Sequence, residues 1–179
     1  TGFIVFYPAY YFRLFHYAHH RFTQDPERDP ELVYPPPTAP WAYVWWAVGI
    51  PYWHRRFGTS FIHAFTGRAK QPIVRDLEVA GCVAEARWMW AGYIAIAIAS
   101  IAFESWAALA YWFGPILLGQ PWLRLYLMAE HTGCANGPDM IANTRTTLTN
   151  PVIRLIAWNM PYHTEHHVYP SVPFHALPV

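Results

Sequence analysis

The sequence predicts an all-α, integral membrane protein with a cytoplasmic, histidine-rich cap and amphipathic helices on the membrane surface. Only 13% of its 179 residues are charged, about half the ~25% of an ordinary soluble domain. Aromatic residues make up 18% of the chain and include ten Trp residues, a residue type favoured at membrane–water interfaces. The histidines are concentrated in two short patterns whose spacing suits a helix. A net charge of +1 gives no indication of a nucleic-acid partner.

The pattern H-x-x-H-H occurs twice, at His16, His19 and His20 and at His163, His166 and His167. Positions i, i+3 and i+4 of a helix lie on one face, so each pattern is expected to direct three imidazoles into one volume. Imidazole is a ligand for iron, zinc, copper and nickel. Two such clusters among only ten histidines predict a metal site, in preference to surface or capping histidines.

The segments HYAHH, RFTQDPERDPE and WNMPYHTEHHVYPSVPFHALP resemble the membrane fatty acid desaturase family, and the resemblance covers nearly the whole chain. It implies an all-helical membrane fold with a histidine-ligated pair of iron ions on the cytosolic side. It also implies O2 as co-substrate, an external electron donor such as ferredoxin or cytochrome b5, and a long-chain acyl or related lipid substrate.

The resemblance further implies a lone histidine ligand between the two patterns, a position that His131 matches. In some relatives an Asn four residues earlier joins the site. This chain has Leu127 there, so water, Glu130 or another group would replace it. Family members also carry a histidine pair upstream, whereas no histidine precedes His16. Residues 1–179 are therefore expected to form one membrane desaturase-like domain whose N-terminal helices and first histidine box are missing from a fragment. The alternative is a natural protein without them, for which the metal site would not be expected to be complete.

Three carboxylates near the histidine patterns are candidates for partners that orient the imidazoles. Asp25 and Asp29 each precede a proline in the loop QDPERDPE, and Glu165 lies within the last pattern. The alternative interpretation of the two aspartates is a solvated loop.

The predicted membrane topology depends on where charge is absent. Residues 1–12 are interpreted as the end of a membrane helix that Pro8 kinks or breaks, and 40–54 as interfacial or re-entrant. Residues 55–87 are expected to form amphipathic surface helices. Residues 88–103 and 105–123 carry no charge and predict a hairpin that turns near Glu104. All twelve basic residues lie outside 88–123, so the positive-inside rule places the histidine patterns in the cytoplasm.

Segment 151–159 (PVIRLIAWN) is expected to be a helix that leads into the last histidine pattern. The function expected from these features is O2-dependent desaturation at a di-iron centre, with no catalytic residues beyond the metal ligands. A lipid hydroxylase, ketolase or epoxidase on the same scaffold is the nearest alternative. A non-catalytic membrane subunit and a haem-binding helical protein also remain open. A zinc hydrolase is disfavoured because H-E-x-x-H is absent and the histidines are too many for one tetrahedral site.

Overall fold

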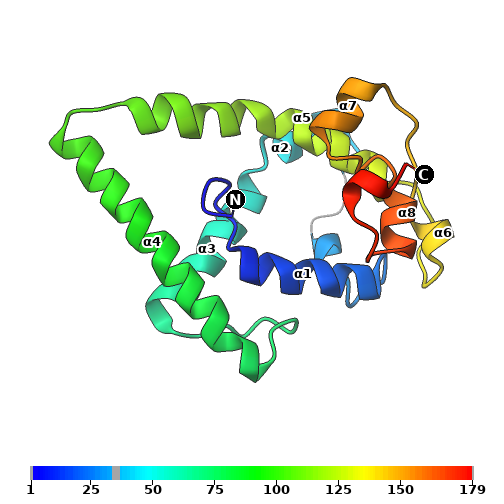
Figure 1. Cartoon of the computed structure of the whole chain (residues 1–179), viewed down its shortest axis with the longest axis horizontal. Helices are drawn as coiled ribbons and strands as arrows, with labels where there is room; N and C mark the ends of the chain where they lie inside the picture. The colour runs from blue at the N-terminus through cyan, green and yellow to red at the C-terminus, as the bar shows by residue number, and fades with distance from the viewer. Residues whose placement is uncertain (1, 34–36, 179) are drawn as a thin grey trace. The chain divides into compact units, whose positions relative to one another are not determined.

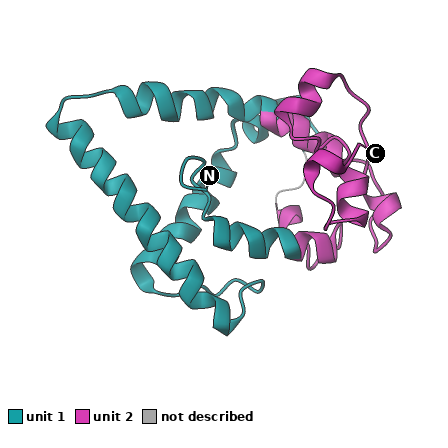
Figure 2. Ribbon diagram, in the orientation of Figure 1, with its two compact units in different colours: residues 1–17, 37–122 teal, residues 18–36, 123–179 magenta. Residues whose placement is uncertain are grey.

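A computed structural model describes residues 2–33 and 37–178, and it confirms the all-α prediction (Figure 1). Within these ranges the only strand-like pairing is an isolated bridge between Thr146 and Tyr162. The chain divides into two compact units (Figure 2). The first comprises residues 1–17 and 37–122, and the second comprises residues 18–36 and 123–179.

Two helices run from one unit into the other: α1 (Ala9–Phe22) and α5 (Gly114–His131). The other elements of the first unit are α2 (Pro40–Val48), α3 (Ile50–Thr66), a 3-10 turn (Asp76–Glu78), α4 (Val79–Ala102) and a π-helical segment (Leu109–Phe113). The other elements of the second unit are a 3-10 turn (Pro30–Val33), α6 (Met140–Asn143), α7 (Pro151–Ile156), α8 (His163–Val168) and a 3-10 turn (Phe174–Ala176).

An aromatic cluster packs around Phe6, which is almost completely buried in the first unit. The Phe6 ring centroid lies 4.8 Å from those of Trp112 and Phe113 and 5.1 Å from that of Tyr93. Residues 2–6 form turns, so the expectation of a membrane helix end over 1–12 was wrong for this part. Pro8 directly precedes α1, which agrees with the predicted break rather than a kink, since proline disfavours helical geometry in the residue before it.

The carboxylate of Glu85 on α4 caps the start of α1. Its two oxygens accept hydrogen bonds from the backbone N–H groups of Ala9, at 2.9 Å, and Tyr10, at 2.6 Å. The first N–H groups of a helix have no partner within the helix, and negative charge there is favoured by the helix dipole. Glu85 therefore fixes the beginning of the helix that carries the first histidine pattern, rather than facing solvent on a surface helix.

Helices α4 and α5 are joined by the turn that the sequence predicts near Glu104. Glu104 has φ +48°, and residues 103–106 separate α4 from the helical residues that lead into α5. Helix α4 begins at Val79, nine residues before the stretch proposed to enter the membrane. Among the described residues, every helix falls short of the combined length and hydropathy that a bilayer crossing demands.

The second unit is organised around a buried asparagine and a tight turn after α1. The Asn143 side chain donates to the backbone oxygens of Thr23, at 3.2 Å, and Gly137, at 2.7 Å, and it is fully buried. The segment expected as one helix into the last histidine pattern is divided into α7 and α8. Trp158 and Asn159 between them have φ +53° and +57°, which lies outside right-handed helical geometry and so interrupts the helix before α8.

Candidate metal centre

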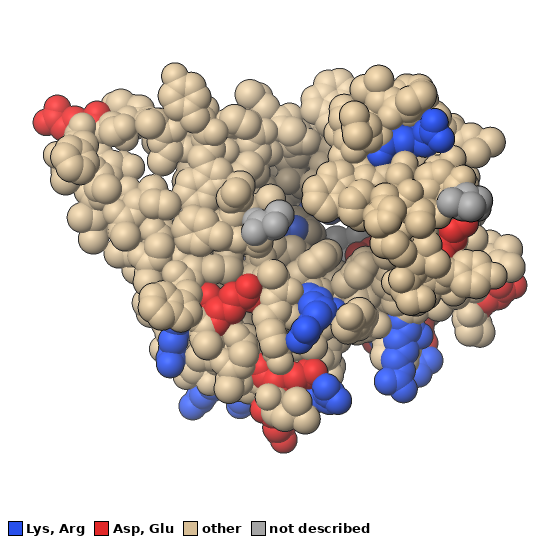
Figure 3. Space-filling model, in the orientation of Figure 1, with Lys and Arg blue, Asp and Glu red and all other residues tan. Residues whose placement is uncertain are grey.

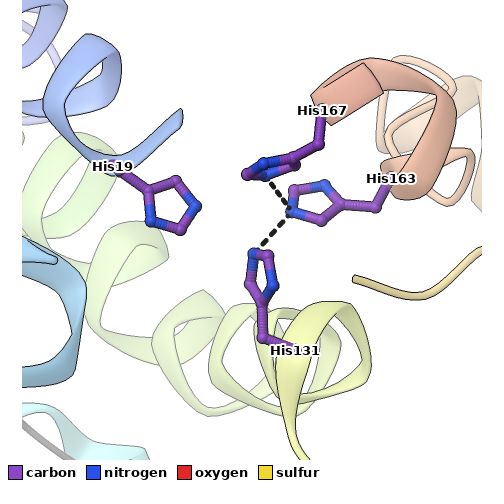
Figure 4. Close-up of side chains that lie close together, drawn as sticks. All are labelled: His19, His131, His163 and His167. Atoms are coloured by element: carbon purple, nitrogen blue, oxygen red, sulfur yellow. Dashed lines mark hydrogen bonds between the residues drawn. The ribbon is translucent and has the colours of Figure 1, made fainter. Parts of the chain in front are cut away.

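Four buried imidazoles from three helices converge in the second unit (Figure 4). His19 comes from α1, His131 from the last turn of α5, and His163 and His167 from adjacent turns of α8. One ring nitrogen of each lies within 4.8 Å of the corresponding nitrogen of every other. We call this group the four-histidine centre.

His163 makes the closest contacts in the four-histidine centre. Its Nε2 lies 2.9 Å from Nε2 of His131 and 3.1 Å from Nε2 of His167 (Figure 4). The ring of His19 meets the rings of His131 and His167 edge-on, with centroids 5.0 and 4.9 Å apart. The four rings therefore bring one nitrogen-bearing edge each toward a common centre.

The outer nitrogens of two of these rings have acceptors that fix where the ring proton lies. Nδ1 of His19 is 3.0 and 3.2 Å from the two carboxylate oxygens of Asp29. Nδ1 of His131 is 3.0 Å from the backbone oxygen of Asn143. A carboxylate or carbonyl oxygen can only accept, so each Nδ1 donates. When these rings are neutral, Nε2 of His19 and Nε2 of His131 are therefore unprotonated, and each presents a lone pair.

Thr23 fixes the proton of a third ring. Its hydroxyl donates to the backbone oxygen of His19 at 2.7 Å. A hydroxyl has one proton, so the Thr23 oxygen acts as acceptor toward Nδ1 of His167, 3.1 Å away. Nε2 of His167 is then a lone pair as well.

These proton positions leave lone pairs facing one another inside the centre. Nε2 of His163 can carry one proton and donate it to His131 or to His167, but not to both. At least one close nitrogen–nitrogen contact is therefore unfavourable unless a cation lies between the rings. Neutral imidazoles whose outer N–H groups are held by protein acceptors form a donor set suited to a transition metal. The residues thus fit a metal site.

Burial keeps most of these rings neutral. It lowers the pKa of His131 to about 4. Burial, with the other histidines adding to it, also lowers the pKa of His163 and of His167 far below the ordinary range. Burial likewise opposes the charged form of His19, but the carboxylates of Glu31 and Asp29 outweigh it and raise that pKa. Neutral rings keep their lone pairs available to metal at neutral pH.

Two acidic side chains lie beside the four-histidine centre. Glu31 Oε2 is 3.7 Å from Nε2 of His19, and Glu130 Oε1 is 3.6 Å from Nδ1 of His163. Burial, reinforced by the charge of Glu31, raises the pKa of Glu130 to about 8. By its position, the Glu130 carboxyl faces Nδ1, the outer nitrogen of His163.

A second histidine pair adjoins the four-histidine centre. Nε2 of His20 lies 3.0 Å from Nε2 of His166, and the ring of His20 stacks on that of His167 with centroids 4.1 Å apart. His16 lies one turn before His20 on α1, in the part of the helix that belongs to the first unit.

The expectation that each pattern directs three imidazoles into one volume was wrong in detail. His19 belongs to the four-histidine centre, whereas its neighbour His20 pairs with His166. Consecutive residues on a helix point about 100° apart because a turn has 3.6 residues. Each pattern therefore contributes to two adjacent groups of imidazoles.

The three predicted carboxylate partners have different surroundings. Asp29 is buried and contacts His19. Asp25 instead accepts from the Arg28 side chain at 2.7 Å and from the backbone N–H groups of residues 27 and 28. Glu165 accepts from the hydroxyl of Thr146.

Sequence reasoning missed the partners Thr23 and Asn143, and it did not place Glu31 at the site. Thr23 and Asn143 carry no metal-binding signature in the sequence, and their roles depend on tertiary contacts. Glu31 follows Pro30 after the predicted Asp29, so its proximity to that residue was the one available signal.

Comparison with known protein families gives a match to the family model described as fatty acid desaturase, over residues 1–178. Neither the curated proteins nor the solved structures gave a significant match to the chain.

Proposed function

Because the chain belongs to the fatty acid desaturase family, we propose that it is an oxidoreductase that desaturates a long-chain acyl or related lipid substrate, using two iron ions and O2. The observation that carries the proposal is the set of buried Nε2 atoms facing one another in the four-histidine centre. The adjoining His20–His166 pair supports a second ion next to the first. An electron donor such as ferredoxin or cytochrome b5 would supply the reducing equivalents.

The four-histidine centre would hold one iron, and His20 and His166 would contribute to the other; His16 is a further candidate ligand from the sequence pattern alone. When bound, the iron pair supplies the redox chemistry with O2 that side chains lack and that removes hydrogen from an unactivated carbon. Asp29, Thr23 and the Asn143 backbone keep the outer ring protons in place, so that Nε2 faces inward. Burial of the rings excludes water and favours the neutral form of His131, His163 and His167.

Iron content and product analysis test this proposal. We expect the purified protein to bind iron in stoichiometric amounts without the Soret band of haem. With a reduced donor and O2, it should yield an acyl product that has lost two hydrogens, as measured by mass spectrometry. Failure to bind iron after anaerobic reconstitution would contradict the metal centre. Bound iron without turnover would indicate a non-catalytic subunit, and a product that has gained oxygen would indicate a hydroxylase or ketolase.

We further propose that the α4–α5 hairpin associates with the membrane and crosses it over the uncharged stretches 88–103 and 105–123. It exposes many large apolar side chains. They include Trp88, Ile94, Ile98, Ile101, Phe103, Trp106, Leu109, Leu117 and Leu118. In Figure 3 the acidic atoms at the turn of the hairpin stand beside uncharged surface, and residues 88–103 and 105–123 carry no Asp, Glu, Lys or Arg. A contiguous apolar surface of this kind is typical of contact with another apolar phase. An acyl substrate would then reach the protein from the bilayer, with the histidines on the cytoplasmic side.

Cysteine accessibility tests this topology. We expect Thr66→Cys, at the exposed end of α3, and Glu104→Cys, at the hairpin turn, to react with a membrane-impermeant maleimide from opposite sides of the membrane. The background should lack Cys134, which is half-buried, whereas Cys82 is buried. Reaction of both cysteines from the same side would contradict the proposed orientation of the hairpin.

A further inference from the structure

The outer nitrogens in the four-histidine centre follow a pattern with one exception. Nδ1 of His19, of His131 and of His167 each has a protein partner within 3.2 Å. Nδ1 of His163 is buried and has no hydrogen-bond partner among the described residues. The nearest acidic oxygen is Glu130 Oε1, at 3.6 Å, and both side chains are largely buried, with 7% and 12% exposed.

Metal binding would change which nitrogen of His163 carries the ring proton, and so which nitrogen requires a hydrogen-bond acceptor. A ring nitrogen that binds metal must present its lone pair, so His163 would bind through Nε2 and carry its proton on Nδ1. That N–H would then be buried without an acceptor. Leaving a buried donor unsatisfied is unfavourable, which would weaken the affinity for the metal.

We propose that Glu130 is the positioning residue for His163, accepting its Nδ1–H when the four-histidine centre is loaded. A side-chain rotation that shortens the 3.6 Å gap to the ~2.8 Å of a charge-assisted hydrogen bond completes the contact. A carboxyl oxygen can accept this hydrogen bond whether the Glu130 side chain is ionised or neutral. The inference rests on the proposed metal centre and adds a partner to it.

The geometry favours this role over direct ligation by Glu130. Glu130 Oε1 faces Nδ1 of His163, on the ring edge opposite the inward-facing Nε2 that contacts His131 and His167. A ligand would instead have to reach the side on which the Nε2 atoms converge. A substitution can distinguish a hydrogen-bond acceptor from a metal ligand. Glutamine can still accept a hydrogen bond from an N–H group, but it is a poor replacement for a carboxylate that binds metal.

Titration with Co(II), a spectroscopic substitute for Fe(II), tests the proposal in the intact protein. Glu130→Ala should weaken Co(II) binding by about 10–100-fold, the usual cost of losing a partner behind a metal ligand. Glu130→Gln should stay within a few-fold of wild type. The exposed Glu27→Gln serves as a matched control and should bind as wild type does. Thermal unfolding without metal checks that each variant is folded.

Each outcome has a distinct meaning. Equal loss in Glu130→Ala and Glu130→Gln would overturn the proposal in favour of a carboxylate ligand. Wild-type affinity in Glu130→Ala would overturn it by showing that His163 needs no such partner. Absence of Co(II) and Fe(II) binding in the wild type would refute the metal centre itself, and the inference would fall with it. Selective loss in Glu130→Ala, with the same metal-free stability as wild type, is the result expected of a positioning residue.

Discussion

Replacement of His163 by alanine is expected to remove the proposed metal from the four-histidine centre and to abolish the proposed desaturation. His163 supplies the Nε2 that lies 2.9 Å from His131 and 3.1 Å from His167, so its loss breaks both of the closest contacts in the group. The loss of activity should exceed the ~10–100-fold that removal of an orienting partner costs. Iron per chain by mass spectrometry and acyl product formation measure the two effects.

A matched variant separates loss of a ligand from loss of a histidine in general. His175 packs against Phe174 in the proline-rich tail, so His175→Ala should keep both iron and activity. His131→Ala should lower iron content as well as rate. Wild-type iron and turnover in His163→Ala would contradict the assignment of the centre.

Asp29→Ala is expected to weaken both the metal site and the fold. Besides His19, the buried Asp29 carboxylate accepts from the backbone N–H groups of Gln24, at 2.8 Å, and Glu31, at 2.9 Å. Metal affinity should fall by ~10–100-fold because Nδ1 of His19 loses its acceptor. The free energy of unfolding should fall by on the order of 1–3 kcal/mol for each donor left buried without a partner.

Thermal unfolding and metal titration of the same sample measure both effects. Asp29→Asn should be milder, since an amide oxygen can still accept from His19. Asp25→Ala is the matched control, because Asp25 also precedes a proline but pairs with the largely exposed Arg28. It should change metal affinity little. Identical behaviour of Asp29→Ala and Asp25→Ala would show that burial of Asp29 has no special role.

The sequence predicted the parts of the site that depend on local spacing. The two H-x-x-H-H patterns do lie on helices, and His131 does join His163 and His167. Family membership over residues 1–178 agrees with the resemblance carried by these patterns. Local spacing therefore predicted that histidines of the two patterns come together, and the family resemblance added His131; that these residues bind metal stays a prediction.

Which polar residues contact the histidines could not be predicted from the sequence, because these contacts depend on the tertiary structure. Asp25 and Asp29 have the same local context, yet only Asp29 is buried against His19. Thr23 and Asn143 carry no chemical signature and act through a single hydroxyl and a backbone oxygen. Glu85 is a helix cap only because α4 packs beside the start of α1.

The Thr23 hydroxyl connects the two histidine patterns through two hydrogen bonds that share one donor direction. The proton of His167 Nδ1 points to Thr23, and the proton of Thr23 points to the carbonyl of His19, so the chain of donors runs one way from α8 to α1. Valine would fill the same space as threonine but would end this chain, whereas serine would continue it. Residue 23 thus needs a hydroxyl that accepts from His167 and donates to His19, whereas side-chain volume matters less.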